Sequence, residues 1–323
     1  MHQATYRLSA VANDASARRA FLMLLAGAVF IALAPIFVRM STIGMLPTAL
    51  WRTALAIPGL VIAAIVVPSG AGRRRTPANI KHVGWFALAG FMFAGDLGTW
   101  HFAISYTSVA DATLFPNTAP IFVAIFTFVL FGTRFSLKFL IGMGIALVGV
   151  ILLLGLSSDV NRQHLVGDGL GMTTALFYAG YFLVIARLRG DYTTPSVMAG
   201  TVIFTTLFLI PTALLAGSSA LPANAAAWLP LIGLALLSQS LGQGLIAYAF
   251  AFLPPAFGAV TLLVQPVIAA AIAWVAFGES VGGIQAASIT IVLTGVLLAR
   301  SGALRPKPYA DSTPDKDHTD ADH

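Results

Sequence analysis

The chain has 323 residues, of which 58% are hydrophobic and only 9% are Asp, Glu, Lys or Arg. A soluble domain carries about 25% charged residues, so this composition excludes an ordinary soluble protein and indicates a polytopic membrane protein. The formal net charge of +6 does not indicate a nucleic-acid partner, because the positive residues fall between the apolar runs. The chain has no cysteine, which excludes a disulfide framework and a cysteine-based metal site.

Apolar runs long enough to cross about 30 Å of hydrocarbon as helices follow one another along almost the whole chain. They predict ten transmembrane helices, at residues 20–39, 46–67, 83–104, 109–131, 137–156, 169–187, 196–217, 228–250, 256–278 and 281–299. A β-barrel would need shorter segments that alternate in polarity, whereas these runs are uniformly apolar. The predicted fold class is therefore an all-α membrane protein.

The two ends of the chain are polar. Residues 1–19 and 301–323 are predicted to be disordered cytoplasmic segments. The sequence before Pro35 resembles a signal-peptide cleavage site. However, a proline directly after such a site disfavours cleavage, so the first helix is expected to be retained.

Two segments, APIFVAIFTFVLFGTR at 119–134 and QPVIAAAIAWVAFGES at 265–280, align without a gap. Pro120 aligns with Pro266, and Gly132 aligns with Gly278. Prolines and glycines at fixed spacing carry more weight than shared apolar residues, because apolar helices resemble one another in any case. The alignment predicts two repeats of five helices each, at 20–156 and 169–300.

An odd number of helices per repeat requires that the second repeat enter the membrane in the opposite sense. With a cytoplasmic N-terminus, 15 of the 18 Lys and Arg residues lie in cytoplasmic segments, as the positive-inside rule requires. The charged loop GAGRRRTPANIKH of the first repeat corresponds to the uncharged GSSALPANAAA of the second. Inverted repeats of this kind are typical of secondary transporters.

Few ionisable residues lie within the predicted helices, and each is a functional candidate because a charge there costs at least about 2.5–3.5 kcal/mol. Arg52, Asp96, His101 and Asp111 fall in the outer half of the membrane. Arg52 is expected to pair with Asp96, with Asp111 as the alternative partner. The pair could be a brace that also gates, or Asp96 and His101 could contact cargo or carry a proton. His101 could instead bond a backbone carbonyl.

The remaining polar residues of the helices predict a cavity, because amide groups in hydrocarbon need partners. Trp100 shares a helix face with Asp96 and is either a cavity wall or an interfacial residue. The candidate substrate-binding residues are Asp96, Trp100, His101, Asn117, Tyr178, Tyr181, Gln239, Gln243 and Gln265. The candidate structural or gating residues are Arg52, Asp111, Glu279, Pro120 and Pro266.

Proline and glycine positions complete the expectations for the helices. Pro35, Pro116, Pro120 and Pro266 are expected to break or kink their helices. Three glycines of the fifth helix are expected to allow close helix packing: Gly142, Gly144 and Gly149. Glu279 at the end of the ninth helix could equally be a solvated or helix-capping residue.

The chain resembles the EamA family of the drug/metabolite transporter superfamily. In that family, each repeat's fourth helix runs from a proline through about ten apolar residues to Phe or Leu, Gly and Glu. The pattern is present at Pro266 and 277–279, and at Pro120 and 131–133 with Thr133 in place of the glutamate. Any role of that acid therefore survives only at Glu279. The resemblance covers about residues 20–300.

The resemblance implies ten helices in two inverted repeats, with a cavity lined mainly by helices 1, 3, 4, 6, 8 and 9 and with helices 5 and 10 at the periphery. It also implies a bacterial inner-membrane carrier of small metabolites, often an exporter. We therefore expect a secondary transporter of amino acids or related compounds that works by alternating access, has both termini in the cytoplasm and uses a proton as candidate coupling ion.

Other functions stay open at this stage. A flippase of lipid or polyprenol-linked headgroups is the first alternative, followed by a membrane-embedded enzyme and a non-transporting scaffold. The sequence has no Walker motif, no metal-ligand cluster within the helices and no nucleophile motif, so enzymatic activity, ATP-driven transport and a cofactor are not expected. The expected partners are a small-molecule substrate and the lipid bilayer, and a homodimer is left open.

Overall fold

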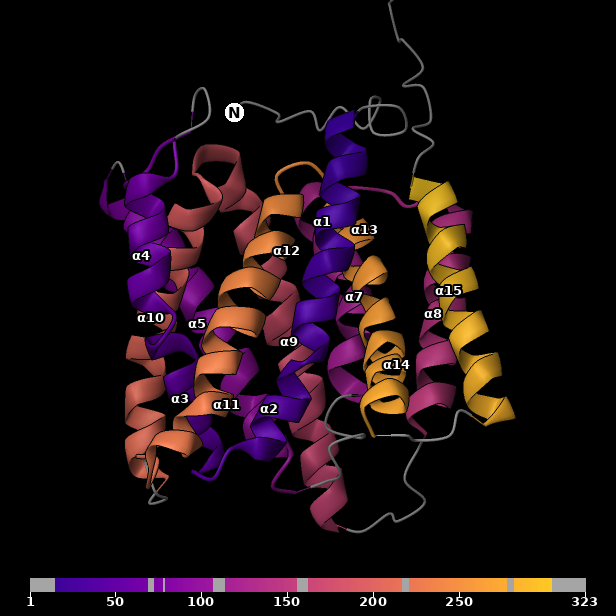
Figure 1. The fold of residues 1–323 in the computed structure, drawn as a ribbon. Helices are drawn as coiled ribbons and strands as arrows, with labels where there is room; N and C mark the ends of the chain where they lie inside the picture. The colour runs from indigo at the N-terminus through magenta and orange to yellow at the C-terminus, as the bar shows by residue number, and fades with distance from the viewer. Residues whose placement is uncertain are drawn as a thin grey trace, which may run out of the picture.

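A computed structural model describes residues 15–68, 73–77, 79–106, 114–155, 162–216, 221–277 and 282–303. The described chain is almost entirely helical, and most helices lie side by side across the height of the molecule (Figure 1). Asp111, Glu279 and most of the two polar tails lie outside the described residues. The first helix begins at Ala15 rather than at residue 20.

The first repeat contains five spans, as predicted. In chain order its helices are α1 (Ala15–Ala32), α2 (Ala34–Met40), α3 (Met45–Ala54), α4 (Ile57–Val66), α5 (Ile80–Ala103), η2 (Phe115–Thr118), α7 (Ala119–Phe131) and α8 (Leu137–Leu154). The first span consists of α1 and α2, the second of α3 and α4, and the fourth of η2 and α7. At 24 residues, α5 is about 36 Å long, enough to cross a membrane although it contains Lys81 and Asp96.

The second repeat contains five further spans. Its helices are α9 (Arg162–Asp191), α10 (Thr194–Leu215), η3 (Ala225–Trp228), α11 (Leu229–Gly233), η4 (Leu234–Gly242), α12 (Gln243–Ala249), α13 (Pro255–Thr261), η5 (Leu262–Val264), α14 (Gln265–Phe277) and α15 (Gly283–Ala303). Eight of the ten spans are helices of at least 18 residues with the hydropathy of membrane spans. The ten-helix prediction is confirmed.

Helix packing follows the internal repeat. The first span packs against the eighth (α1 on η4 and α12), and their counterparts pack in the same way (α9 on α5). The second and seventh spans contact each other (α3 and α4 on α10), as do the fifth and tenth (α8 on α15). These contacts between the repeats are therefore symmetric, which is the arrangement expected of two inverted repeats.

Several spans are interrupted where the sequence places a proline. The first span breaks at Leu33, two residues before Pro35. Pro120 and Pro266 are each the second residue of an α-helix, α7 or α14, that directly follows a 3₁₀ turn. Proline is favoured in the first turn of a helix because it lacks the N–H that would have no partner there. The two aligned prolines therefore occupy the same structural position in both repeats.

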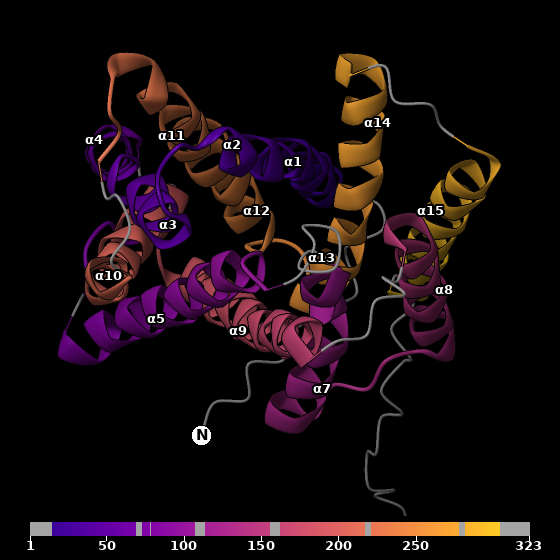
Figure 2. The same ribbon diagram turned by 90° about the horizontal axis from the view of Figure 1, so that it is seen from below.

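A pair formed by α8 and α15 stands at the edge of the bundle (Figure 2). A Cβ on Gly142 would lie 2.2 Å from the backbone nitrogen of Ala299, and one on Gly149 would lie 2.6 Å from that of Val292. The predicted close packing is confirmed at these two glycines. It was wrong for Gly144, whose Cβ would meet no atom within 4 Å because that residue lies on another face of α8.

We expect Gly142→Ala to lower the melting temperature, although alanine is the better helix former. The added methyl group must displace the backbone of α15, and overpacking of this kind typically costs about 1–3 kcal/mol. The matched variant Gly144→Ala adds the same group where space is open and should leave the melting temperature unchanged or raise it. Thermal unfolding in detergent measures both variants. Equal responses would contradict the glycine-mediated contact.

Candidate functional site

A cavity of about 250 Å³ lies between the two repeats. Its lining comes from spans 1 to 6, 8 and 9, with single residues from spans 2, 5 and 8. This agrees with the lining implied by the family resemblance. The lining residues are Ile31, Ala32, Ala34, Pro35, Arg52, Asp96, Leu97, Trp100, Pro116, Asn117, Leu154, Thr174, Tyr178, Gln243, Gln265, Pro266 and Ala269.

The structure brings many of the predicted site residues together in this cavity. The lining includes Asp96, Trp100, Asn117, Tyr178, Gln243 and Gln265 among the candidate substrate-binding residues, and Arg52 and Pro266 among the gating candidates. It does not include His101, Tyr181, Gln239 or Pro120. Thr174 also lines the cavity but was not among the residues predicted from the sequence. Its hydroxyl lies 2.8 Å from that of Thr99 and joins α9 to α5.

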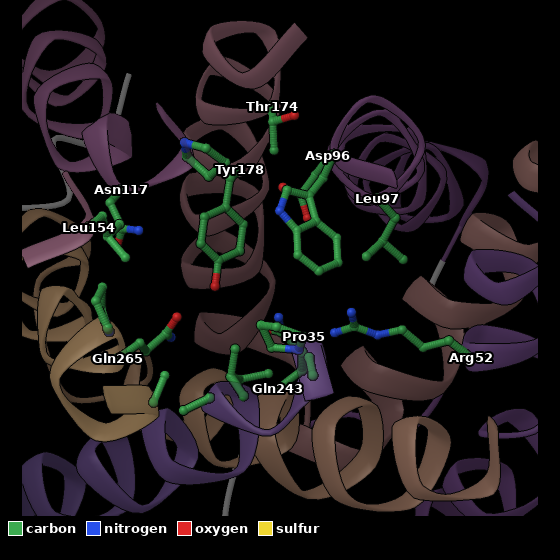
Figure 3. A pocket seen from close by; sticks show the side chains of 17 residues that line it. Pro35, Arg52, Asp96, Leu97, Asn117, Leu154, Thr174, Tyr178, Gln243 and Gln265 are labelled. Atoms are coloured by element: carbon green, nitrogen blue, oxygen red, sulfur yellow. The ribbon is translucent and has the colours of Figure 1, made fainter. Parts of the chain in front are cut away.

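Arg52 is buried in α3 with 3% of its surface exposed. Its Nε donates a hydrogen bond of 3.1 Å to the Oε1 of Gln239 in η4, and its guanidinium lies 5.9 Å from the centroid of the Phe93 ring. Figure 3 shows the end of the side chain pointing from α3 into the cavity. Gln239 thus orients Arg52 from outside the cavity lining.

The expected contact between Arg52 and Asp96 is not formed, which corrects the sequence-based prediction. Among the described residues, Arg187 and Asp191 form an ion pair with N and O atoms within 4.0 Å, whereas Arg52 and Asp96 do not. Asp96 is 8% exposed and lines the same cavity as Arg52, but no described side chain donates a hydrogen bond to it. The Nε of Arg52 donates its hydrogen bond to Gln239. The two charged groups therefore line the same cavity without contacting each other.

The eighth span contains a nine-residue π-helix, η4, that ends directly before Gln243. π-Helices are rare and occur frequently at functional sites. Gln239 lies within η4 and Gln243 is the first residue of α12, and the two amides have different roles. One binds Arg52 and the other lines the cavity.

A polar group of three side chains lies on another wall of the cavity. The hydroxyl of Tyr178 from α9 lies beside the amides of Gln243 and Gln265 (Figure 3). The Oε1 of Gln243 and the Nε2 of Gln265 are buried without a hydrogen-bond partner in the described structure. Tyr181 stacks on Phe93 behind this wall, with ring centroids 4.6 Å apart.

His101 and Trp100 differ in position although they are neighbours in α5. The Nδ1 of His101 lies 2.8 Å from the carbonyl oxygen of Leu97, which is the backbone contact considered as an alternative for this residue. Trp100 lines the cavity and is 9% exposed. The rotation of α5 therefore directs Asp96 and Trp100 to the cavity and directs His101 away from its lining.

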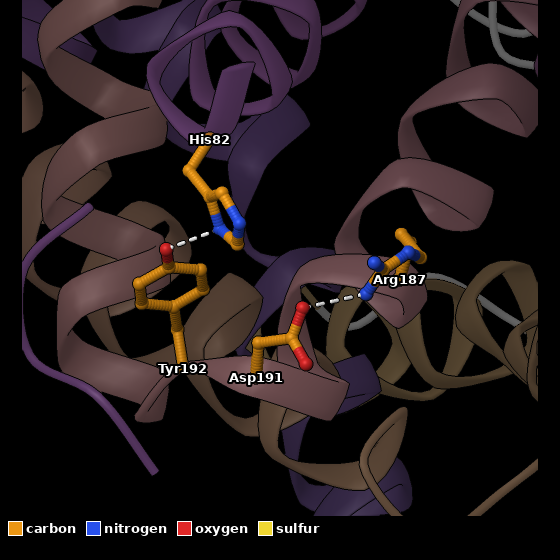
Figure 4. Close-up of polar contacts among 4 residues, drawn as sticks. All are labelled: His82, Arg187, Asp191 and Tyr192. Carbon is orange, nitrogen blue, oxygen red and sulfur yellow. Dashed lines mark hydrogen bonds and ion pairs between the residues drawn. The ribbon is translucent and has the colours of Figure 1, made fainter. Parts of the chain in front are cut away.

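The face of the molecule at which α1 begins, here called the N-terminal face, is closed by contacts between the repeats. A β-bridge joins Arg74 of the first repeat to Tyr192 of the second. The Tyr192 hydroxyl shares a hydrogen bond of 2.5 Å with the Nδ1 of His82 in α5 (Figure 4). Nearby, the buried Arg189 donates hydrogen bonds to the carbonyl oxygens of Ala247 and Tyr192.

Buried apolar side chains fill the space between this face and the cavity. Leu24 and Ala28 of α1 have no exposed surface. Phe182 of α9 and Phe250, directly after α12, are buried and pack edge to face with ring centroids 4.9 Å apart. The cavity lining instead includes Leu154, the last residue of α8, so the cavity extends toward the opposite face.

Comparison with known proteins agrees with this architecture. Residues 18–155 and 165–301 each match the sequence model of the EamA-like transporter family. One solved crystal structure has a similar fold, with a TM-score of 0.73 over 88% of this chain and 97% of that chain at 18% identity.

Three curated relatives are transporters by name. An uncharacterized transporter of Archaeoglobus fulgidus is 25% identical over 61% of this chain and 69% of its own length. The pseudopaline exporter CntI of Pseudomonas aeruginosa is 25% identical over 66% and 74%. The threonine/homoserine exporter RhtA of Salmonella typhimurium is 26% identical over 63% and 66%. The two family matches together cover most of the chain, which therefore belongs to the EamA-like transporter family of the drug/metabolite transporter superfamily.

Proposed function

We propose that this protein is a secondary transporter that exports a small metabolite, an amino acid or a related compound, by alternating access. The observation that supports this most is the cavity between the repeats, whose lining comes from both halves. A site shared by two inverted repeats can be exposed to either side when one repeat rocks against the other. Two of the related proteins named above are exporters.

The N-terminal face is closed and the cavity extends toward the opposite face. This arrangement corresponds to one state of such a cycle. In our proposal the protein lies in a bacterial inner membrane with both termini in the cytoplasm, so the cytoplasmic side is the closed one. The contacts of Tyr192 with Arg74 and His82 join the repeats on that side. Breaking them would let the repeats separate there and admit cargo from the cytoplasm.

The size and polarity of the cavity favour a small cargo. Pockets for drug-sized ligands have volumes of about 300–1,000 Å³, whereas this cavity has about 250 Å³. Its lining combines apolar residues with Arg52, Asp96 and a few polar groups. A compact molecule with charged or polar groups fits this lining better than a long acyl chain does.

A proton is the proposed coupling ion. Of the two groups expected to carry a proton, Asp96 lines the cavity and His101 does not. The gating candidate Glu279, a third group that could take part, lies outside the described residues. A carboxylate that can bind either a proton or cargo gives a simple route to exchange. Asp96 is therefore the proposed site of coupling.

Ala269→Phe is expected to abolish export, because a phenyl ring would fill much of the cavity that Ala269 lines. The control Val129→Phe places the same ring where the native side chain is 70% exposed on the outside of the bundle. Untargeted comparison of medium and cytosol from cells expressing each variant measures export. The transported metabolite should leave the cells with the control and accumulate inside with Ala269→Phe. Undiminished export by Ala269→Phe would contradict the role of the cavity.

Tyr192→Phe is expected to open the N-terminal face more often, since it removes the hydrogen bond to His82 but keeps the ring that packs on Phe86. Loss of one hydrogen bond of about 0.5–1.5 kcal/mol should raise the labelling rate of Ala28→Cys by a maleimide about two- to tenfold. The chain has no native cysteine to interfere. Asp191→Asn removes an exposed ion pair on the same face and should leave the rate unchanged. An unaltered rate in Tyr192→Phe would exclude this contact as a gate.

A pH gradient is expected to drive transport of the metabolite identified in that comparison. In proteoliposomes that are more acidic on the side opposite the N-terminal face, cargo should accumulate on that side in exchange for protons. A protonophore that collapses the pH gradient should reduce the rate of cargo transport to that of counterflow, the exchange of cargo on one side for cargo on the other. Transport that is insensitive to the gradient would refute proton coupling and would leave a uniporter.

A further inference from the structure

We propose that Arg52 and Asp96 form a binding site for a zwitterion, with the cargo's carboxylate at Arg52 and its ammonium group at Asp96. This inference rests on the proposed function, because it names the chemical class of the cargo and its orientation in the same cavity. It assigns Gln239 as a positioning residue that acts through Arg52. The site consists of these groups and the apolar walls between them.

The first step concerns the free part of the guanidinium. Gln239 accepts the hydrogen bond of the Arg52 Nε, which holds the side chain in one orientation. The two terminal nitrogens point into the cavity (Figure 3). A guanidinium presents its donors as a planar fork that binds both oxygens of a carboxylate. Because the Nε is already bound, the fork of terminal nitrogens is held ready for an anionic group.

The second step concerns the opposite charge. Asp96 lines the same cavity, its carboxylate receives no hydrogen bond from a described side chain, and it is more than 4.0 Å from the Arg52 nitrogens. A charge buried without a partner is strongly destabilising. A cation alone would leave Arg52 unpaired and an anion alone would leave Asp96 unpaired. A zwitterion between them supplies a partner for both.

The third step concerns the walls around the charges. Trp100 lies on the same face of α5 as Asp96 and lines the cavity, where an aromatic face can attract an ammonium group. Ile31, Leu97 and Ala269 provide apolar surface, and the amides of Gln243 and Gln265 offer one unpartnered atom each. The cavity therefore fits an α-, β- or γ-amino acid with a small apolar or hydroxylated side chain.

Thermal unfolding of the full-length protein in lipid nanodiscs tests the proposal with a panel of α-, β- and γ-amino acids. At saturating concentration, at least one of them should raise the melting temperature by a few degrees, because a ligand that binds only the folded state stabilises it. The methyl ester of that compound lacks the carboxylate and its N-acetyl derivative lacks the ammonium group. Each derivative should lose the effect.

Variants of the two charged residues complete the test. Arg52→Gln and Asp96→Asn should each abolish the shift, whereas Arg187→Gln, which removes an exposed guanidinium, should retain it. Gln239→Leu should weaken binding, and the shift should return in part with Gln239→Asn. If a neutral variant does not fold, Arg52→Lys and Asp96→Glu take its place, and each should require at least about tenfold more ligand because the fork or the reach is changed.

Three results would overturn the proposal: no amino acid raises the melting temperature, the ester or the N-acetyl derivative does so equally, or a neutral variant keeps the full response. The proposed function is tested separately by the export comparison with Ala269→Phe. Export of a metabolite without opposite charges, lost in that variant, would refute the zwitterion site and leave the transporter standing. If Ala269→Phe retained both export and ligand binding, this would count against the proposed function and against the zwitterion site.

Discussion

In the hydrocarbon of a membrane, every backbone N–H and C=O group needs a partner within the protein, so a helix can be interrupted only where protein or a cavity surrounds it. Four of the interruptions in this chain meet that condition. The break at Leu33, the 3₁₀ turns before Pro120 and Pro266, and the π-helix η4 are each within or directly beside the cavity lining. The repeat places the two 3₁₀ turns symmetrically, so the internal symmetry of the fold also locates the cavity.

The same requirement applies to charge. Burying the charges of Arg52 and Asp96 costs free energy. The two side chains do not form an ion pair with each other that would offset this cost. A brace would bring the two groups into contact and fill the cavity between them. The hydrogen bond from Arg52 to Gln239 instead joins the first repeat to the second at the edge of the cavity. Movement of one repeat against the other would therefore alter the position of Arg52, and in the proposed cycle this links cargo binding to the opening of the cavity.

The ten spans and their division into repeats could be predicted from the sequence, because run length, loop charge and aligned prolines are properties of composition and spacing. The cavity residues Asn117, Tyr178, Gln243 and Gln265 could be predicted because amides and phenols are rare in such helices. The rotation of each helix about its axis could not be predicted. It decides that His101 and Gln239 lie outside the cavity lining and that Gly144 is not a packing glycine. Thr174 was missed because its hydroxyl also bonds its own helix, like many other threonines in this chain.

In the proposed transport cycle, one cavity between the repeats is reached from both sides of the membrane. This two-sided access is tested most directly by placing a single cysteine at the cavity-lining position Leu97 of the cysteine-free chain. The protein is reconstituted in sealed vesicles, and a membrane-impermeant maleimide is added to one side at a time. Alternating access predicts labelling from both sides, faster from the side opposite the N-terminal face. Labelling from only one side under all conditions, including an excess of cargo on either side, would contradict it.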